Sequence, residues 1–235
     1  MARTYQIREL LSRRPDLSTF LVHLTKSDRG NAAGELSSIL RDRQLLARHS
    51  PTLMNTVLEA QVGRLGDTAP MRRNVVCMTD TPLDGIWMMC QDIESRGTRL
   101  QPFGLVFTRA WGRRSGVNPV FYVDQTPGHP WLTVPMNRLA ATLNDKQLDD
   151  LAAVLPFVET MGPGKDFAWE REWRHVGDLP FELSDIVAVI APEDWHQHLA
   201  STLQVDRPWI DPEWSLQRMI AALAGVPWPD ADPMW

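Results

Sequence analysis

The stretch that decides the fold is a short apolar run ending in polar groups, Ser18-Thr19-Phe20-Leu21-Val22-His23-Leu24-Thr25. A run of this length with polar residues at its end is typical of a buried β-strand. Similar runs predict further strands at 74–79, 104–108, 118–123, 169–176 and 185–190. These strands do not alternate regularly with helices, which disfavours a doubly wound sheet. The sequence therefore predicts an α+β fold, in which helices flank a small mixed, partly antiparallel sheet.

Helical patterns separate and follow the predicted strands. They predict helices from about residue 33, over 81–95, over 136–155 with a break at Asn144-Asp145, over 194–203 and over 211–225. The chain of 235 residues is expected to form a single domain, 1–235. Residues 19–192 are its predicted core, and residues 193–235 are a predicted C-terminal helical extension with a proline-rich tail.

Composition limits the class of protein. The chain has 24 Lys+Arg against 29 Asp+Glu, a net charge of −5, and 43% hydrophobic residues, which are ordinary globular values. The net acidity argues against a general nucleic-acid coat protein, although a local basic patch is compatible with it. Two cysteines, Cys77 and Cys90, predict a reducing, cytoplasmic location. No apolar run reaches the length of a membrane span, so no membrane partner is expected.

Common cofactor motifs are missing from the sequence. There is no glycine-rich dinucleotide fingerprint, no phosphate-binding P-loop and no nucleophile elbow. His196 and His198 are two positions apart on a predicted helix, which places them on different faces. No metal site is expected.

Two features could bind an anionic or polar ligand. In a strand, His23 and Thr25 share one side, and they form a polar spot at the edge of the predicted core. A structural histidine with satisfied hydrogen bonds is the competing interpretation. Arg72 and Arg73 precede the strand at 74–79, and an arginine pair there suits a pyrophosphate, although a solvated pair is more common.

The third feature is an unusual run of charged and aromatic residues, Trp169-Glu170-Arg171-Glu172-Trp173-Arg174. If the whole run is a strand, Glu170, Glu172 and Arg174 share one face. Two carboxylates and a guanidinium are costly to bury without a purpose. An exposed edge strand with paired charges is the alternative interpretation.

The first of these pieces resembles a known family. His23-Leu24-Thr25, followed by Leu36-Ser37-Ser38-Ile39-Leu40, is similar to the opening of the ADP-ribosyltransferase toxins that modify nucleic acids and of related phage-defence proteins. In those proteins, a histidine followed by a threonine begins the NAD pocket, and a helix of Leu-x-x-Ile-Leu character comes after it. The resemblance implies an ADP-ribosyltransferase-like fold.

Later pieces extend this resemblance in the same order. Glu170-x-Glu172 is similar to the paired glutamates of many ADP-ribosyltransferases. The Pro119-Val120-Phe121-Tyr122 strand and the segment from Glu170 to Arg174 also resemble those of an abortive-infection, phage-resistance family. The resemblance is at the level of motifs and covers, in scattered pieces, roughly residues 19–192.

The resemblance implies an NAD-dependent ADP-ribosyltransferase, a toxin or phage-defence effector that modifies nucleic acid or protein. NAD would be a substrate, and no metal would be needed. Cleavage of the nicotinamide–ribose bond passes through an oxocarbenium-like transition state, which a nearby carboxylate stabilises. We assign this role to Glu172 and the orientation or deprotonation of the acceptor to Glu170.

The residues expected to bind NAD follow from the same resemblance. His23 and Thr25 would hold the ribose and the amide, Arg73, or Arg72 in its place, would bind the pyrophosphate, and Tyr122 or a tryptophan would stack on the nicotinamide. For the acceptor, Arg113 and Arg114 next to Trp111 form a basic turn that could hold a phosphate and stack a base. A solvated hairpin is the alternative for that turn.

Two other functions remain open on the sequence. One is a non-catalytic interaction protein, such as an antitoxin or sensor of a defence system, for which the acidic charge and the ten tryptophans are suitable. The other is a metal-dependent nuclease built on Asp166, Glu170 and Glu172, which lacks the expected downstream lysine. A toxin–antitoxin partner is compatible with both the transferase and the antitoxin hypotheses.

Overall fold

A computed structural model describes residues 16–26, 31–49, 74–94, 96–128, 131–164 and 166–225. These residues form two compact units, each assembled from separate stretches of chain. Unit 1 contains the described residues up to Arg43, Thr79–Gly112 and those from Phe181 onward; unit 2 contains the described residues within 44–78 and 113–180.

Unit 1 is built on a mixed sheet, in agreement with the predicted α+β class. Its strands follow the order β12-β11-β5-β1, with β1, β5 and β11 antiparallel and β11 parallel to β12. His23 lies opposite Leu105, and Val22 pairs with Thr79 at the end of β4. The strands are β1 (Phe20–Lys26), β5 (Leu100–Thr108), β11 (Ile186–Ile190) and β12 (Trp209–Ile210).

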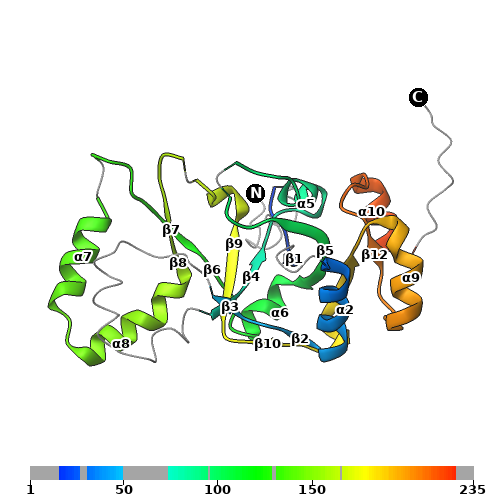
Figure 1. The fold of residues 1–235 in the computed structure, drawn as a ribbon, viewed down its shortest axis with the longest axis horizontal. Coiled ribbons are helices and arrows are strands. Elements are labelled where there is room, and N and C mark those ends of the chain that lie inside the picture. Colours follow the sequence, from blue (N-terminus) through cyan, green and yellow to red (C-terminus); the bar gives the residue numbers. More distant parts are fainter. Residues whose placement is uncertain are drawn as a thin grey trace, which may run out of the picture. The chain divides into compact units, whose positions relative to one another are not determined.

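Helices cover both faces of this sheet. One face packs Val22, Val106 and Ile190 against Ile86 and Met219. α2 contacts β1, β5 and α9 but contributes no residue to this cluster, so it covers the other face (Figure 1). The helices are α2 (Ala32–Asp42), η1 (Leu83–Gly85), α5 (Ile86–Met89), α6 (Arg109–Arg114, whose last two residues belong to unit 2), η4 (Leu183–Asp185), α9 (Glu193–Leu203) and α10 (Leu216–Leu223).

Gly104 sits where the central strand has no room for a side chain. It pairs with Leu24 on one side and Ile190 on the other. A Cβ atom there would clash with the backbone carbonyl oxygen of His23, which cannot move without breaking the β1–β5 pairing. We expect Gly104→Ala to lower the free energy of unfolding by about 1–3 kcal/mol in a urea titration.

Gly97→Ala is the matched control for this prediction. A Cβ at Gly97 would meet nothing within 4 Å, so the change should stay within about 0.5 kcal/mol. Equal stabilities of the Gly104→Ala and Gly97→Ala proteins would show that the sheet tolerates a side chain at Gly104.

Unit 2 contains several pairs of short strands. β3 pairs with β4 and β6 with β9, both antiparallel, and β9 lies next to β4. Two further pairs stand apart, β2 with β10 and the parallel pair β7 with β8. The strands are β2 (Gln44–Leu45), β3 (Arg48–His49), β4 (Asn74–Thr79, whose last residue belongs to unit 1), β6 (Asn118–Pro119), β7 (Phe121–Asp124), β8 (Val158–Met161), β9 (Glu172–Val176) and β10 (Leu179–Pro180).

Two helices pack on the β7–β8 pair and complete unit 2. The predicted break at Asn144-Asp145 is confirmed, because Asn144 and Gln147 form a reciprocal capping box that starts a new helix. Val123 and Val158 of the strands pack against Ala140 and Ala152 of the helices (Figure 1, green). The helices are α7 (Thr133–Thr142) and α8 (Asp145–Val154), with single turns at η2 (Leu155–Phe157) and η3 (Ala168–Glu170).

Candidate functional site

The predicted strand over 169–176 is shorter in the structure and begins at Glu172. Ala168–Glu170 form a turn of 3₁₀ helix, and Arg171 adopts a left-handed conformation with φ of 51°. Such a conformation ends the helical turn and redirects the chain into β9. The prediction that Glu170 shares a strand face with Glu172 is therefore wrong, whereas Glu172 and Arg174 do lie on one face of β9.

The carboxylate of Glu172 is held by Arg174 through a two-pronged ion pair. Arg174 Nε donates to Glu172 Oε1 at 2.9 Å, and Arg174 Nη2 donates to Glu172 Oε2 at 2.7 Å. The Arg174 side chain is 2% exposed and that of Glu172 is 15% exposed. A charge-assisted bidentate pair of this kind fixes the orientation of both groups.

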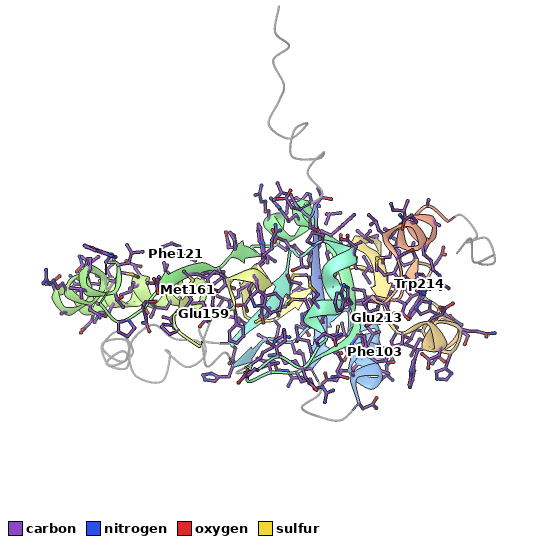
Figure 2. The ribbon with its side chains drawn as sticks, turned by 90° about the horizontal axis from the view of Figure 1, so that it is seen from above. Phe103, Phe121, Glu159, Met161, Glu213 and Trp214 are labelled. Carbon is purple, nitrogen blue, oxygen red and sulfur yellow. The ribbon has the colours of Figure 1, made fainter. Side chains whose placement is uncertain are left out.

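A second carboxylate, Glu159 of β8, completes this cluster. Arg174 Nη2 also donates to Glu159 Oε2 at 2.9 Å, and Arg174 Nη1 donates to the Pro156 carbonyl oxygen at 2.8 Å. The Glu159 side chain is 5% exposed (Figure 2, labelled). Burial alone would lower the pKa of Arg174, but the adjoining carboxylate of Glu172 raises it above the usual arginine range.

Tyr122 belongs to the same group of side chains. It lies on β7 in register with Glu159. Burial, followed by the negative charges of Glu172 and Glu170, raises the pKa of Tyr122, so its phenol is neutral at physiological pH. The structure thus groups Tyr122 and Glu172, which the sequence analysis selected, with Glu159 and Arg174, and the charge of Glu170 also acts on Tyr122. We call these five residues the glutamate cluster.

His23 and Thr25 lie on β1 in unit 1. Val22 and Leu24 point into the core cluster of unit 1, so His23, which is partly buried, lies on the opposite face. The Thr25 side chain is only 2% exposed, and its Oγ1 has no hydrogen-bond partner among the described residues. A buried hydroxyl without a partner is costly, which makes Thr25 a candidate for binding a ligand.

The predicted arginines have different outcomes. Arg73 and Arg72 lie outside the described residues. Arg113 and Arg114 are exposed at the end of α6, and the Arg113 guanidinium carbon is 5.9 Å from the centre of the Trp173 ring. Cation–π contacts of this length hold an exposed arginine in place only weakly.

The predicted role of Trp111 in stacking a base is wrong. The segment is a helix rather than a turn, and Trp111 is buried. Its ring stacks on Phe107 with centroids 4.2 Å apart, so it serves the core of unit 1.

A second buried polar group in unit 1 was not predicted from the sequence. Asp80 is buried and pairs with Arg109 at 3.4 Å, and Arg109 Nη1 also donates to the Ser18 carbonyl oxygen at 3.0 Å. Thr79 and Thr81 share a hydrogen bond between their hydroxyls at 2.8 Å. These contacts tie the end of β4 to the starts of β1 and α6. The signal in the sequence is the polar triplet Thr79-Asp80-Thr81, which begins with the last residue of the predicted strand 74–79.

Three further features bear on chemistry. Burial raises the pKa of Cys90 to about 12, so this residue is a neutral thiol and a poor nucleophile at physiological pH. Within the described ranges, no three His, Cys, Asp or Glu side chains are grouped to hold a metal ion. None of the described helices combines the length and apolar composition needed to cross a bilayer.

Comparisons of this chain with models of known protein families, with curated proteins and with solved structures gave no match.

Proposed function

We propose that this protein is an NAD-dependent ADP-ribosyltransferase with an ADP-ribosyltransferase-like fold, acting in the cytoplasm as a toxin or phage-defence effector. The observation that carries the proposal is the glutamate cluster. Tyr122 and Glu172 come from separate motifs in the sequence, and in unit 2 Tyr122 is in register with Glu159, whose carboxylate binds the same guanidinium as Glu172. The resemblance of the His23-Leu24-Thr25 strand and the mixed α+β architecture add support.

The chemistry needs a fixed negative charge next to the ribose. As the bond between ribose C1′ and the nicotinamide nitrogen breaks, its electron pair leaves with nicotinamide and positive charge develops on the ribose. The oriented carboxylate of Glu172 stabilises that charge. Each carboxylate oxygen has two acceptor positions, and Arg174 occupies one on each oxygen, so Glu172 keeps acceptor capacity for a ribose hydroxyl.

The other residues bind and deliver the reactants. Glu170 accepts the proton of the acceptor as its oxygen or nitrogen bonds to C1′. In the proposal, His23 and Thr25 bind the ribose and the amide of NAD. Arg73 binds the pyrophosphate, and Tyr122 stacks on the nicotinamide. The Thr25 hydroxyl gains the hydrogen bond that it lacks among the described residues.

A thermal-shift experiment with separate additions of NAD and Mg²⁺ tests this function. Binding to the folded state raises the melting temperature, and NAD at 100 times its dissociation constant adds about 2.7 kcal/mol. We expect a shift with NAD and release of nicotinamide. A shift with Mg²⁺ alone would favour the nuclease hypothesis, and no shift with either would contradict the transferase.

A non-catalytic interaction protein is the second candidate function, and a specific observation favours it. Both oxygens of Glu172 already accept hydrogen bonds from a buried arginine, an arrangement that also serves a purely structural pair. Trp131, Leu132 and Leu139, at and just before α7, are large apolar side chains exposed to solvent. A protein of this kind would bind a toxin or antitoxin partner and would release no nicotinamide.

The acceptor is proposed to be a nucleic acid, or a protein associated with one, bound in part by Arg113 and Arg114. We expect the double variant Arg113→Glu/Arg114→Glu to reduce ADP-ribose transfer to nucleic acid by about 10-fold or more at physiological salt. The slope of the logarithm of the binding constant against the logarithm of the salt concentration should become less steep by about 2, one for each lost phosphate contact. Incorporation of label from NAD into the nucleic acid measures the transfer, and filter binding at several salt concentrations measures the salt dependence.

Arg138→Glu provides the control, since Arg138 is an exposed arginine of α7 and lies outside both α6 and the glutamate cluster. It should change binding less than the double variant. Transfer to protein alone, unaffected by Arg113→Glu/Arg114→Glu, would remove the nucleic-acid part of the proposal.

A further inference from the structure

Two carboxylates of the glutamate cluster share one guanidinium in a largely buried setting. Arg174 contributes one positive charge, whereas Glu159 and Glu172 contribute two carboxylates. Glu159 is buried at 4% exposure and accepts bonds from Arg174 and from the backbone N–H of Thr160 at 3.2 Å. Burying a carboxylate costs several kcal/mol, and a second carboxylate on the same guanidinium recovers only part of that cost. A contribution to stability is therefore a weak explanation for a glutamate at position 159.

The geometry connects Glu159 to Glu172 through a single rigid group. The planar guanidinium of Arg174 is held from β8 by Glu159 and from η2 by the Pro156 carbonyl. Its remaining prongs hold both oxygens of Glu172. Because the guanidinium cannot bend, fixing one edge of it fixes the orientation of the carboxylate on the other.

We infer that Glu159 is a positioning residue that acts through Arg174 to orient the Glu172 carboxylate toward the reacting ribose. The inference rests on the proposed function. Within the cluster, Glu170 of η3 acts electrostatically on Tyr122 of β7, and Cys77 of β4, outside the cluster, acts on Arg174. A carboxylate that is fixed beside the ribose favours the positive charge that develops there.

A double-mutant cycle on nicotinamide release tests this assignment. The proteins compared are the wild type, Glu159→Gln, Glu172→Gln and the double variant, each checked for folding by circular dichroism and by its melting temperature. Glutamine keeps the shape of Glu159 but removes its charge. We expect Glu159→Gln to lower kcat by about 10-fold with little change in KM for NAD, as for a supporting residue that acts through a catalytic group.

The decisive measurement is the effect of Glu159→Gln on kcat in the Glu172→Gln protein. If Glu159 acts through Glu172, then Glu159→Gln should change kcat by less than about 2-fold when Glu172 is already glutamine. A merely structural role would reduce the activity by the same factor in both backgrounds. Glu94→Gln, a change at an exposed glutamate in unit 1, should leave kcat as in the wild type in both.

The outcomes separate this inference from the function on which it rests. Equal losses in the two backgrounds, or no loss from Glu159→Gln, overturn the positioning role while the transferase stands. Absence of nicotinamide release from the wild type overturns both. If Glu159→Gln does not fold, Glu159→Asp takes its place, because it keeps the charge and moves the carboxylate back by one methylene; the same pattern of kcat values is then expected.

Discussion

Arg174→Met is expected to lower the free energy of unfolding by about 3–5 kcal/mol. Methionine fills a similar volume but leaves Glu159 and Glu172 buried in unit 2 without their shared guanidinium. The Pro156 carbonyl oxygen also loses the hydrogen bond from Arg174. Urea titration, followed by circular dichroism, measures the change.

Arg99→Met is the control for this result. Arg99 pairs with Asp92 at 2.9 Å, a distance like those in the glutamate cluster, but both side chains are exposed. Its replacement should cost no more than about 1 kcal/mol. Arg174→Lys keeps the charge without the planar fork and should fall between the two. Equal losses for Arg174→Met and Arg99→Met would contradict the buried cluster.

Glu172→Gln is expected to reduce nicotinamide release by about 100-fold or more. The change is nearly isosteric, so the chain should still fold with a loss of no more than about 2 kcal/mol. Activity falls because the ribose then develops its positive charge without a carboxylate beside it. Steady-state rates at several NAD concentrations separate an effect on kcat from one on KM.

Glu182→Gln is the control for Glu172→Gln. Glu182 also pairs with an arginine, Arg43, at 3.1 Å, but its side chain is exposed. This control should retain wild-type rates. A Glu172→Gln protein that is folded and fully active would show that Glu172 is a structural partner of Arg174 only.

Local patterns in the sequence predicted much of the fold. The strand 74–79 was predicted with its observed bounds, and the break before α8 followed from Asn144. Both depend on interactions between residues close in the chain. The helix predicted over 211–225 begins only at Leu216, because Ser215 caps it and Asp211 instead accepts hydrogen bonds from the backbone of Glu193 and Glu213. The second of those contacts is local, but the first joins residues far apart in sequence.

The candidate site was predicted only in part, because local patterns reveal some of its residues and not the contacts between residues distant in the chain. Glu172, Arg174 and Tyr122 stand out locally as charged or aromatic residues within predicted strands. Glu159 did not, because it lies beyond the helix predicted to end at residue 155 and before the strand predicted from residue 169, where no element was predicted. Its importance comes from Arg174, 15 positions later in the chain, and such a pairing cannot be deduced from periodicity. The burial of Trp111 likewise depends on its contact with Phe107 and on helix α6. The arginine-rich segment was predicted as a turn and not as a helix.

The central claim is tested most directly by following NAD labelled in its adenosine part. The labelled NAD is incubated with the chain and with DNA, RNA or cell lysate, and both the label and free nicotinamide are measured. The proposed function predicts nicotinamide release and label on an acceptor, both lost in Glu172→Gln. No label on any acceptor, together with no nicotinamide release and no NAD binding, would contradict it.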